Sequence, residues 1–257
     1  MINYNYTDIK TKTKILTILL VISIIIKLIL CTSITYNIKL INKIQNGLEI
    51  SETEIEKYEA SVRILVISEI AIIILVIIFF FIWLNNAYKN IYTMKIQSIE
   101  YTPNWAVGWF FIPILNLFRP FQIIRELWKA SNPEYMPNEG ISWKSQNTEK
   151  IIIFFWTFYL ISEIFLRGVI KLSELRETDT AEEMLRSCRI TLFQQILYII
   201  SAILLIKIVR TITIMQKQKY LKISNNPIID KFECSECGGL VKEADTICPH
   251  CNAKLED

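Results

Sequence analysis

Residues 70–84 read IAIIILVIIFFFIWL, an unbroken run of fifteen apolar side chains. With its flanking positions the run covers residues 62–84, and a helix of that length crosses the ~30 Å hydrocarbon core of a bilayer. A helix buried in a large soluble core is the alternative, but several such runs leave too little polar surface to cover them. The sequence therefore predicts an all-α membrane protein with four transmembrane helices, at residues 15–36, 62–84, 151–172 and 190–214.

The composition of the whole chain agrees with this class. Of its 257 residues, 52% are hydrophobic and 21% charged, with only 6 Gly and 7 Pro. Disordered and collagen-like chains are excluded, because they have few large apolar residues or many Gly and Pro. The net charge of +3 is too small to indicate a nucleic-acid partner by itself.

Residues 105–118 form a fifth apolar run, which is too short to cross the bilayer. Fourteen residues extend only about 21 Å as a helix, and Pro113 and Asn116 interrupt them. Trp105 and Trp109 are typical of the membrane–water interface. We expect this run to be re-entrant or to lie on the membrane surface.

Arg119 and Pro120 open an amphipathic helix after this run, because proline suits the first helical turn. We expect the helix to lie along the lipid headgroups and to complete an interfacial segment over residues 105–131. A helix packed on the soluble domain of a partner is the alternative. Its apolar face comprises Phe121, Ile124, Leu127 and Trp128, and its polar face Gln122, Arg125, Glu126 and Lys129.

The distribution of Lys and Arg predicts the orientation in the membrane. The N-terminal arm, the loop 85–150 and the tail 215–257 together hold 16 of these residues, whereas the other two loops hold 7. Basic residues concentrate in cytoplasmic loops, so both termini are predicted to be cytoplasmic. The predicted organisation is a cytoplasmic arm (1–14), a four-helix membrane domain (15–214), a basic linker (215–229) and a zinc ribbon (230–257).

The zinc ribbon is predicted from two C-x-x-C pairs separated by ten residues, Cys234 with Cys237 and Cys248 with Cys251. Four thiolates complete a tetrahedron around Zn²⁺ and leave no open position, so one structural zinc ion is expected. An Fe–S centre or a redox pair is the alternative, but a redox pair would be a single C-x-x-C within a βαβ unit. A reducing cytosol also keeps these cysteines as thiols.

Charge indicates the kind of partner that the ribbon contacts. Residues 228–257 contain three Lys and seven Asp or Glu, and zinc with four thiolates adds further negative charge. A phosphate-binding module needs the opposite sign. We therefore expect a protein partner and no nucleic acid.

Ionisable residues within the predicted spans mark a further candidate site, because charges in a bilayer are costly. Lys27, Glu69, Glu163 and Arg167 fall at similar depths in three different helices, and Gln194 with Gln195 falls nearby in the fourth. We expect one intramembrane polar cluster. It is either a structural network that fixes helix register or a transport or sensing pathway.

The run from Trp105 through Trp109, Pro113 and Asn116 to Arg119 and Pro120 resembles the signature of a bacterial membrane family, domain of unknown function 4328. Asn104 stands where the family pattern has glycine. The resemblance covers roughly residues 60–215 and implies a multi-helix domain of the bacterial inner membrane, often followed by a ribbon. It implies no catalytic role.

The function expected from these features is a non-catalytic membrane scaffold or sensor whose ribbon contacts a cytosolic protein. The chain lacks the H-E-x-x-H, G-x-S-x-G and phosphate-loop motifs, and it contains a single histidine, His250. The alternative is a small transporter or channel-like component that uses the intramembrane polar cluster.

Overall fold

A computed structural model describes residues 4–136, 143–145, 147, 149–174, 180–225, 231–234, 236–242 and 246–254. Long helices dominate it, and four of them are long and apolar enough to cross a membrane. These helices confirm the predicted all-α class with four candidate membrane-spanning helices. The four helices are α1 (Lys10–Gln45), α2 (Glu52–Thr93), α5 (Lys150–Glu174) and α6 (Ala181–Asn225).

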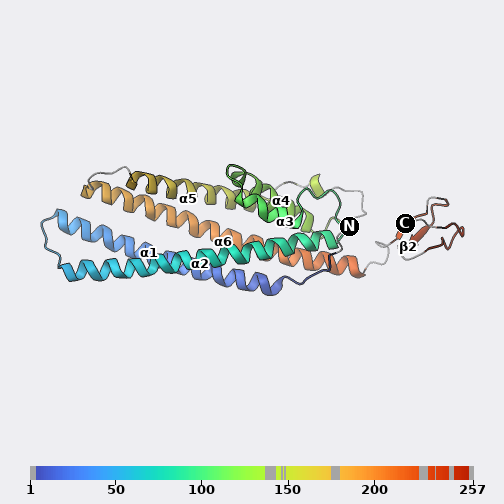
Figure 1. The fold of residues 1–257 in the computed structure, drawn as a ribbon, viewed down its shortest axis with the longest axis horizontal. Coiled ribbons are helices and arrows are strands. Elements are labelled where there is room, and N and C mark those ends of the chain that lie inside the picture. Colours follow the sequence, from blue (N-terminus) through green and yellow to red (C-terminus); the bar gives the residue numbers. More distant parts are fainter. Residues whose placement is uncertain are drawn as a thin grey trace.

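These helices form an elongated bundle (Figure 1). The connection between α1 and α2 lies at the same end as the last turn of α5 and the first turn of α6. Helix α1 packs on both α2 and α6, and α5 packs on α6. Apolar side chains on the outer faces, such as Ile18, Ile67 and Ile196, are exposed, as expected of positions that contact lipid.

Three of the helices continue well beyond the predicted spans. With 36, 42 and 45 residues, α1, α2 and α6 reach ~54, ~63 and ~68 Å, about twice the thickness of the hydrocarbon core. Helix α2 starts at an N-cap, because the Ser51 side chain accepts a hydrogen bond from the backbone of Glu54. The acidic residues of its first turn add favourable charge at the positive end of the helix.

The short apolar run does not cross the bundle, as predicted. It folds into α3 (Pro103–Gly108) and two 3₁₀ turns, η1 (Trp109–Phe111) and η2 (Leu115–Leu117). Ile114 adopts a positive φ of 69° between these turns, so the chain reverses there. The rings of Phe110 and Phe81 contact each other, so the run lies level with the last apolar turns of α2.

Helix α4 (Arg119–Ser131) corrects one prediction. It packs against α2 and α6 of the same chain, and Ile124 and Leu127 of its predicted apolar face are buried there. Glu126, which the sequence places on the polar face, is buried at 6% exposure. Its carboxylate accepts hydrogen bonds from the backbone of Glu100 and Tyr101 and from the hydroxyl of Tyr88. These three donors compensate for the loss of water around the carboxylate.

The C-terminal tail contains β1 (Lys231–Glu233) and β2 (Leu240–Lys242), which pair antiparallel with Phe232 opposite Val241. An isolated antiparallel bridge joins Ile247 to Lys254.

A short 3₁₀ turn, η3 (Trp143–Ser145), lies between α4 and α5 in the sequence.

Candidate functional site

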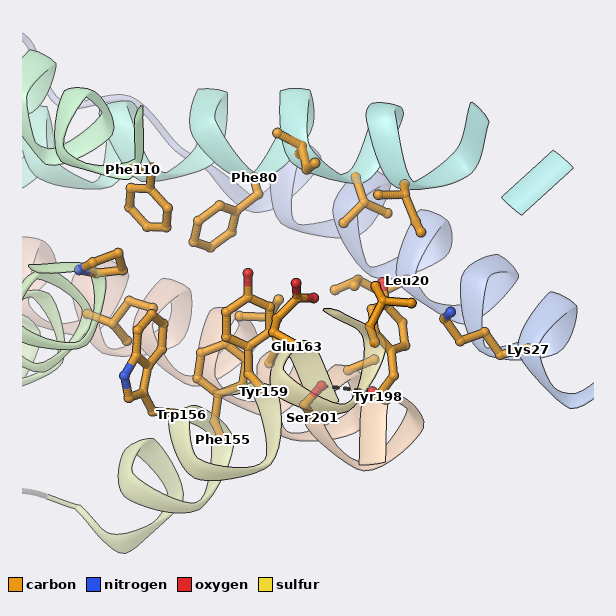
Figure 2. Close-up of a pocket in the computed structure, with 18 of the residues that line it drawn as sticks. Leu20, Lys27, Phe80, Phe110, Phe155, Trp156, Tyr159, Glu163, Tyr198 and Ser201 are labelled. Atoms are coloured by element: carbon orange, nitrogen blue, oxygen red, sulfur yellow. Dashed lines mark hydrogen bonds between the residues drawn. The ribbon is translucent and has the colours of Figure 1, made fainter. Parts of the chain in front are cut away.

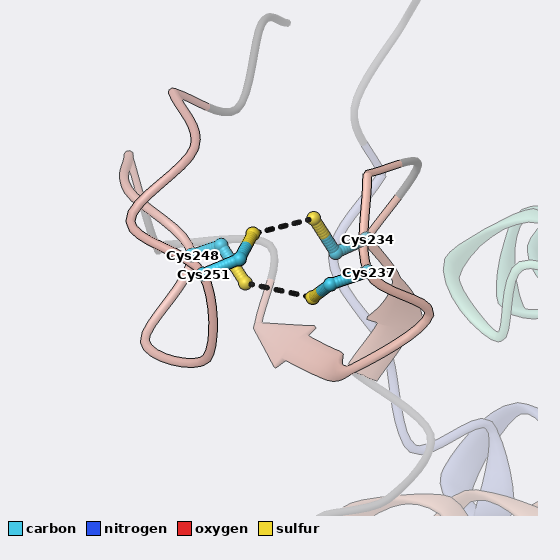
Figure 3. Close-up of side chains that lie close together, drawn as sticks. All are labelled: Cys234, Cys237, Cys248 and Cys251. Atoms are coloured by element: carbon cyan, nitrogen blue, oxygen red, sulfur yellow. Dashed lines mark hydrogen bonds between the residues drawn. The ribbon is translucent and has the colours of Figure 1, made fainter.

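The four cysteines of the tail converge on one point (Figure 3). Their sulfur atoms all lie within 4.8 Å of one another, and the sulfurs of Cys234 and Cys251 and of Cys237 and Cys248 are 3.7 Å apart. A disulfide would need about 2.05 Å between sulfurs. A tetrahedron with metal–sulfur bonds of about 2.3 Å has edges of about 3.8 Å. The cysteines could therefore hold a metal ion.

The two C-x-x-C turns have the same backbone geometry. In the first, the amide of Cys234 donates to Gly239 and the amide of Gly238 donates back to Cys234. In the second, the amide of Cys248 donates to the carbonyl of Ala253, and the amide of Asn252 donates back to the carbonyl of Cys248. Gly238 and Asn252 have positive φ values of 69° and 59°, which glycine and asparagine tolerate best.

Gly239 is required for a different reason, which is space. A Cβ atom there would lie 2.5 Å from the ring of His250, too close for any side chain. The backbone amide of His250 lies 3.4 Å from the sulfur of Cys248 and donates to it. Such N–H to sulfur bonds stabilise a thiolate, which is the form that binds metal.

A second candidate site lies between the membrane helices. Lys27 of α1 is 3% exposed and forms an ion pair with Glu69 of α2. The ammonium nitrogen also lies 4.1 Å from the ring centre of Tyr198 in α6. A carboxylate and an aromatic face thus hold one buried cation together.

Glu163 of α5 faces the same region (Figure 2). It lines a cavity of about 540 Å³ together with Lys27, Glu69 and both predicted glutamines, Gln194 and Gln195. The structure therefore brings five of the six polar residues singled out in the spans to one cavity.

Arg167 does not join this group. Its side chain is exposed one helical turn beyond Glu163 and does not line the cavity. Two residues that the sequence analysis missed take part instead, Tyr159 and Tyr198. Each lies four positions from a predicted polar residue, Glu163 and Gln194, so helical spacing alone would have placed them on the same faces.

The signature run closes one end of this cavity. Asn116 and Pro120 line it, while Arg119 points elsewhere and donates hydrogen bonds of 3.0 and 3.1 Å to the Tyr101 hydroxyl and the Gln122 side chain. The Arg119 guanidinium lies 5.1 Å from the ring centre of Trp109. The signature thus provides both a wall of the cavity and the contacts that hold this wall in place.

The remaining signature residues shape the run itself. The rings of Trp105 and Trp109 contact each other at 5.2 Å between centroids, and Pro113 separates the two 3₁₀ turns. The indole of Trp156 in α5 donates to the carbonyl of Leu117 and ties the run to the bundle.

A sequence profile described as domain of unknown function, DUF4328, matches residues 46–214, more than half of the chain. The chain belongs to the DUF4328 family. The match ends before the four-cysteine cluster, so the cysteines lie outside it. Most residues that line the cavity lie within the DUF4328 region, whereas Leu20 and Lys27 of α1 precede it. No curated protein and no solved structure matches this DUF4328 chain.

A buried polar network that the sequence analysis missed joins the DUF4328 region to the residues on either side of it. Asn90 of α2 exchanges hydrogen bonds with both backbone groups of Thr7 and donates to Gln216 of α6. Gln216 in turn donates to Ser131 of α4, and the fully buried Lys219 donates to the carbonyl of Ala130. This network joins the N-terminal arm, α2, α4 and α6 beyond the predicted spans.

Proposed function

We propose that this DUF4328 protein is a non-catalytic membrane scaffold or sensor whose zinc ribbon contacts a cytosolic protein. The observation that carries the proposal is the convergence of four cysteine sulfurs in the tail. A metal ion with four protein ligands has no position left for a substrate, so it shapes a surface. A small folded surface attached to a membrane domain suits the capture of a partner.

The metal in this proposal is one Zn²⁺ ion. The sulfur spacing fits tetrahedral zinc, and four cysteines form a structural zinc set. The acidic character of residues 228–257 favours a protein partner over nucleic acid. The family resemblance favours the bacterial inner membrane, and the distribution of Lys and Arg favours an orientation with both termini in the cytoplasm.

A second candidate function is a small transporter or channel-like component. The cavity lined by Lys27, Glu69 and Glu163 favours it, because ionisable groups inside a membrane bundle often mark a solute pathway. Flux of a solute in reconstituted vesicles that is lost in Glu69→Ala or Glu163→Ala would support transport over the scaffold.

The scaffold is tested by affinity capture from membranes. Solubilised wild-type protein and Cys248→Ser are compared after crosslinking, with Cys188→Ser as the matched control, because Cys188 lies in α6 away from the ribbon. We expect specific cytosolic proteins to be retained by the wild type and by Cys188→Ser and lost with Cys248→Ser. Identical recovery from all three proteins would count against a role of the ribbon in binding.

A further inference from the structure

The cavity between the four long helices combines a polar end with an aromatic wall. Its volume of about 540 Å³ lies in the range of small-molecule sites. Figure 2 shows the Glu163 carboxylate directed into it next to Tyr159, and Phe80 and Trp156 also line the cavity. A ligand of this cavity would place one polar group at the carboxylate and an apolar body against the rings.

The charges of the lining residues indicate the sign of that polar group. Lys27 and Glu69 neutralise each other in an ion pair. Within the part of the chain that the structure describes, no ion pair or hydrogen bond joins the Glu163 carboxylate to another side chain. The residues that line the cavity therefore carry one net negative charge; Arg167, which acts electrostatically on Glu163 from one helical turn away, is exposed and does not line the cavity. This net charge favours a cation and disfavours an anion.

A second observation indicates that the cation donates hydrogen bonds. Gln195 lines the cavity, is 8% exposed, and its Oε1 atom is buried without a hydrogen-bond partner among the described residues. A buried acceptor without a donor is costly. A ligand that offers N–H groups would bind the carboxylate of Glu163 and, once the Gln195 side chain turns towards the cavity, would also satisfy this amide oxygen.

The protein already binds one ammonium group in this way. The Lys27 ammonium is held by the carboxylate of Glu69 and the ring face of Tyr198. At the other side of the cavity, Glu163 and Tyr159 offer the same pair of groups, a carboxylate and an aromatic ring one helical turn apart.

We propose that the cavity is a binding site for a primary organic amine with an apolar body, whose ammonium group contacts Glu163 and Gln195. The amine would be the signal that the proposed sensor detects, and this role rests on the sensor function proposed above. Quaternary ammonium compounds would bind less well because they have no N–H donor, and carboxylates would be repelled by Glu163.

The test uses the full-length protein in phosphatidylcholine nanodiscs and isothermal titration with phenylbutylamine. Protein-free nanodiscs correct for partitioning into lipid. Phenylbutyltrimethylammonium, phenylbutanol and phenylbutanoate share the apolar body and differ in the polar group. We expect the primary amine to bind most tightly, then the quaternary compound, then the alcohol, with no binding of the carboxylate.

Two variants and one control locate the site. Glu163→Gln should weaken amine binding by about 10- to 100-fold, as expected for loss of a charge-assisted hydrogen bond. Gln195→Leu should remove the preference for the primary over the quaternary amine. Glu59→Gln makes the same chemical change at an exposed position of α2 and should bind as the wild type does.

Binding of the alcohol as tight as that of the amine would overturn the proposal, as would unchanged binding by Glu163→Gln. If Glu163→Gln does not fold, the order of the four compounds on the wild type still decides. No ribbon partner is present in these titrations. Failure here would therefore leave the capture experiment on the ribbon unaffected, and failure of that experiment would leave amine binding unaffected.

Discussion

The ammonium of Lys27 in α1 pairs with the carboxylate of Glu69 in α2, 42 residues further along the chain. Both groups lie within the predicted membrane spans, where neither has bulk water as an alternative partner. The pair therefore fixes the register between two helices whose other contacts are largely apolar and non-directional.

The first prediction concerns this pair. Lys27→Met leaves the Glu69 carboxylate without its partner, and breaking a buried pair costs about 3–5 kcal/mol in soluble proteins. We expect less folded protein and a lower thermal midpoint in detergent. Adding Glu69→Gln should recover most of the loss, because both charges are then absent. Losses that simply add in the double variant would show that the two side chains do not interact.

The second prediction concerns the metal. Purified full-length protein should contain one zinc ion per chain by elemental analysis, and Cys248→Ser should contain almost none, because three thiolates do not close the tetrahedron. The tail of the variant should become sensitive to protease, while the membrane domain stays folded. Cys188→Ser is the control and should keep its zinc. Full zinc content in Cys248→Ser would contradict the assigned ligands.

The third prediction concerns Arg119 of the signature. Arg119→Ala removes two hydrogen bonds, to Tyr101 and Gln122, and the contact with Trp109. We expect a loss of about 1–3 kcal/mol of stability and faster proteolysis between residues 109 and 118. Arg63→Ala, at an exposed position of α2, should change neither. Equal proteolysis of the two variants would show that Arg119 does not hold the run.

The fourth prediction is a pH dependence set by Glu126. Burial raises the pKa of Glu126 above its ordinary value of 4.5, and the hydrogen bonds from Glu100, Tyr101 and Tyr88 oppose this shift only in part. The folded state therefore binds a proton more readily than the unfolded state does. The stability that Glu126 contributes should be full below the ordinary pKa and should fall as pH rises through the raised pKa.

Glu126→Gln removes this titration. The amide nitrogen of the substituted side chain would face a backbone N–H group, so two donors would oppose each other. The variant should be less stable than the wild type, with the largest difference in thermal midpoint near pH 4 and a smaller one near pH 7. Glu59→Gln controls for the loss of a carboxylate at an exposed position. A difference that grows with rising pH would have the wrong sign for a raised pKa.

The fifth prediction is the topology. Reporter fusions after Asp257 and within residues 85–100 should both report the cytoplasm, and a fusion within residues 45–60 should report the opposite side, because the 16 Lys and Arg residues lie on the side of the termini. Activity of the C-terminal fusion outside the cell would reverse the orientation.

Hydropathy predicted the four membrane helices well because long apolar runs have few other uses in a protein. It underestimated their lengths because it stops at the first charged residues, whereas Lys, Glu and Gln are good helix formers and extend α2 and α6. The cysteine spacing predicted the cluster because local turn geometry alone brings two C-x-x-C pairs to one metal.

The buried carboxylate of Glu126 in α4 could not be predicted in the same way. Glu126 is polar and falls on the polar side of the helix pattern, but its hydrogen-bond partners lie 25 to 38 positions away in the sequence. Asn90 and Gln216 are 126 positions apart and lie beyond the predicted spans. Contacts of this kind depend on tertiary packing, which helical periodicity does not encode.

Helix α6 runs without a break from Ala181 to Asn225, and this continuity has a mechanical consequence. Gln195, beside the cavity, is 30 residues from Asn225, or ~45 Å along the helix. A stiff rod of that length acts as a lever arm, so a tilt of about 5° pivoting at the cavity displaces the far end by ~4 Å. A small tilt of α6 at the cavity would therefore become a displacement of several ångströms at Asn225. From this end of α6 the chain continues towards the cysteine cluster.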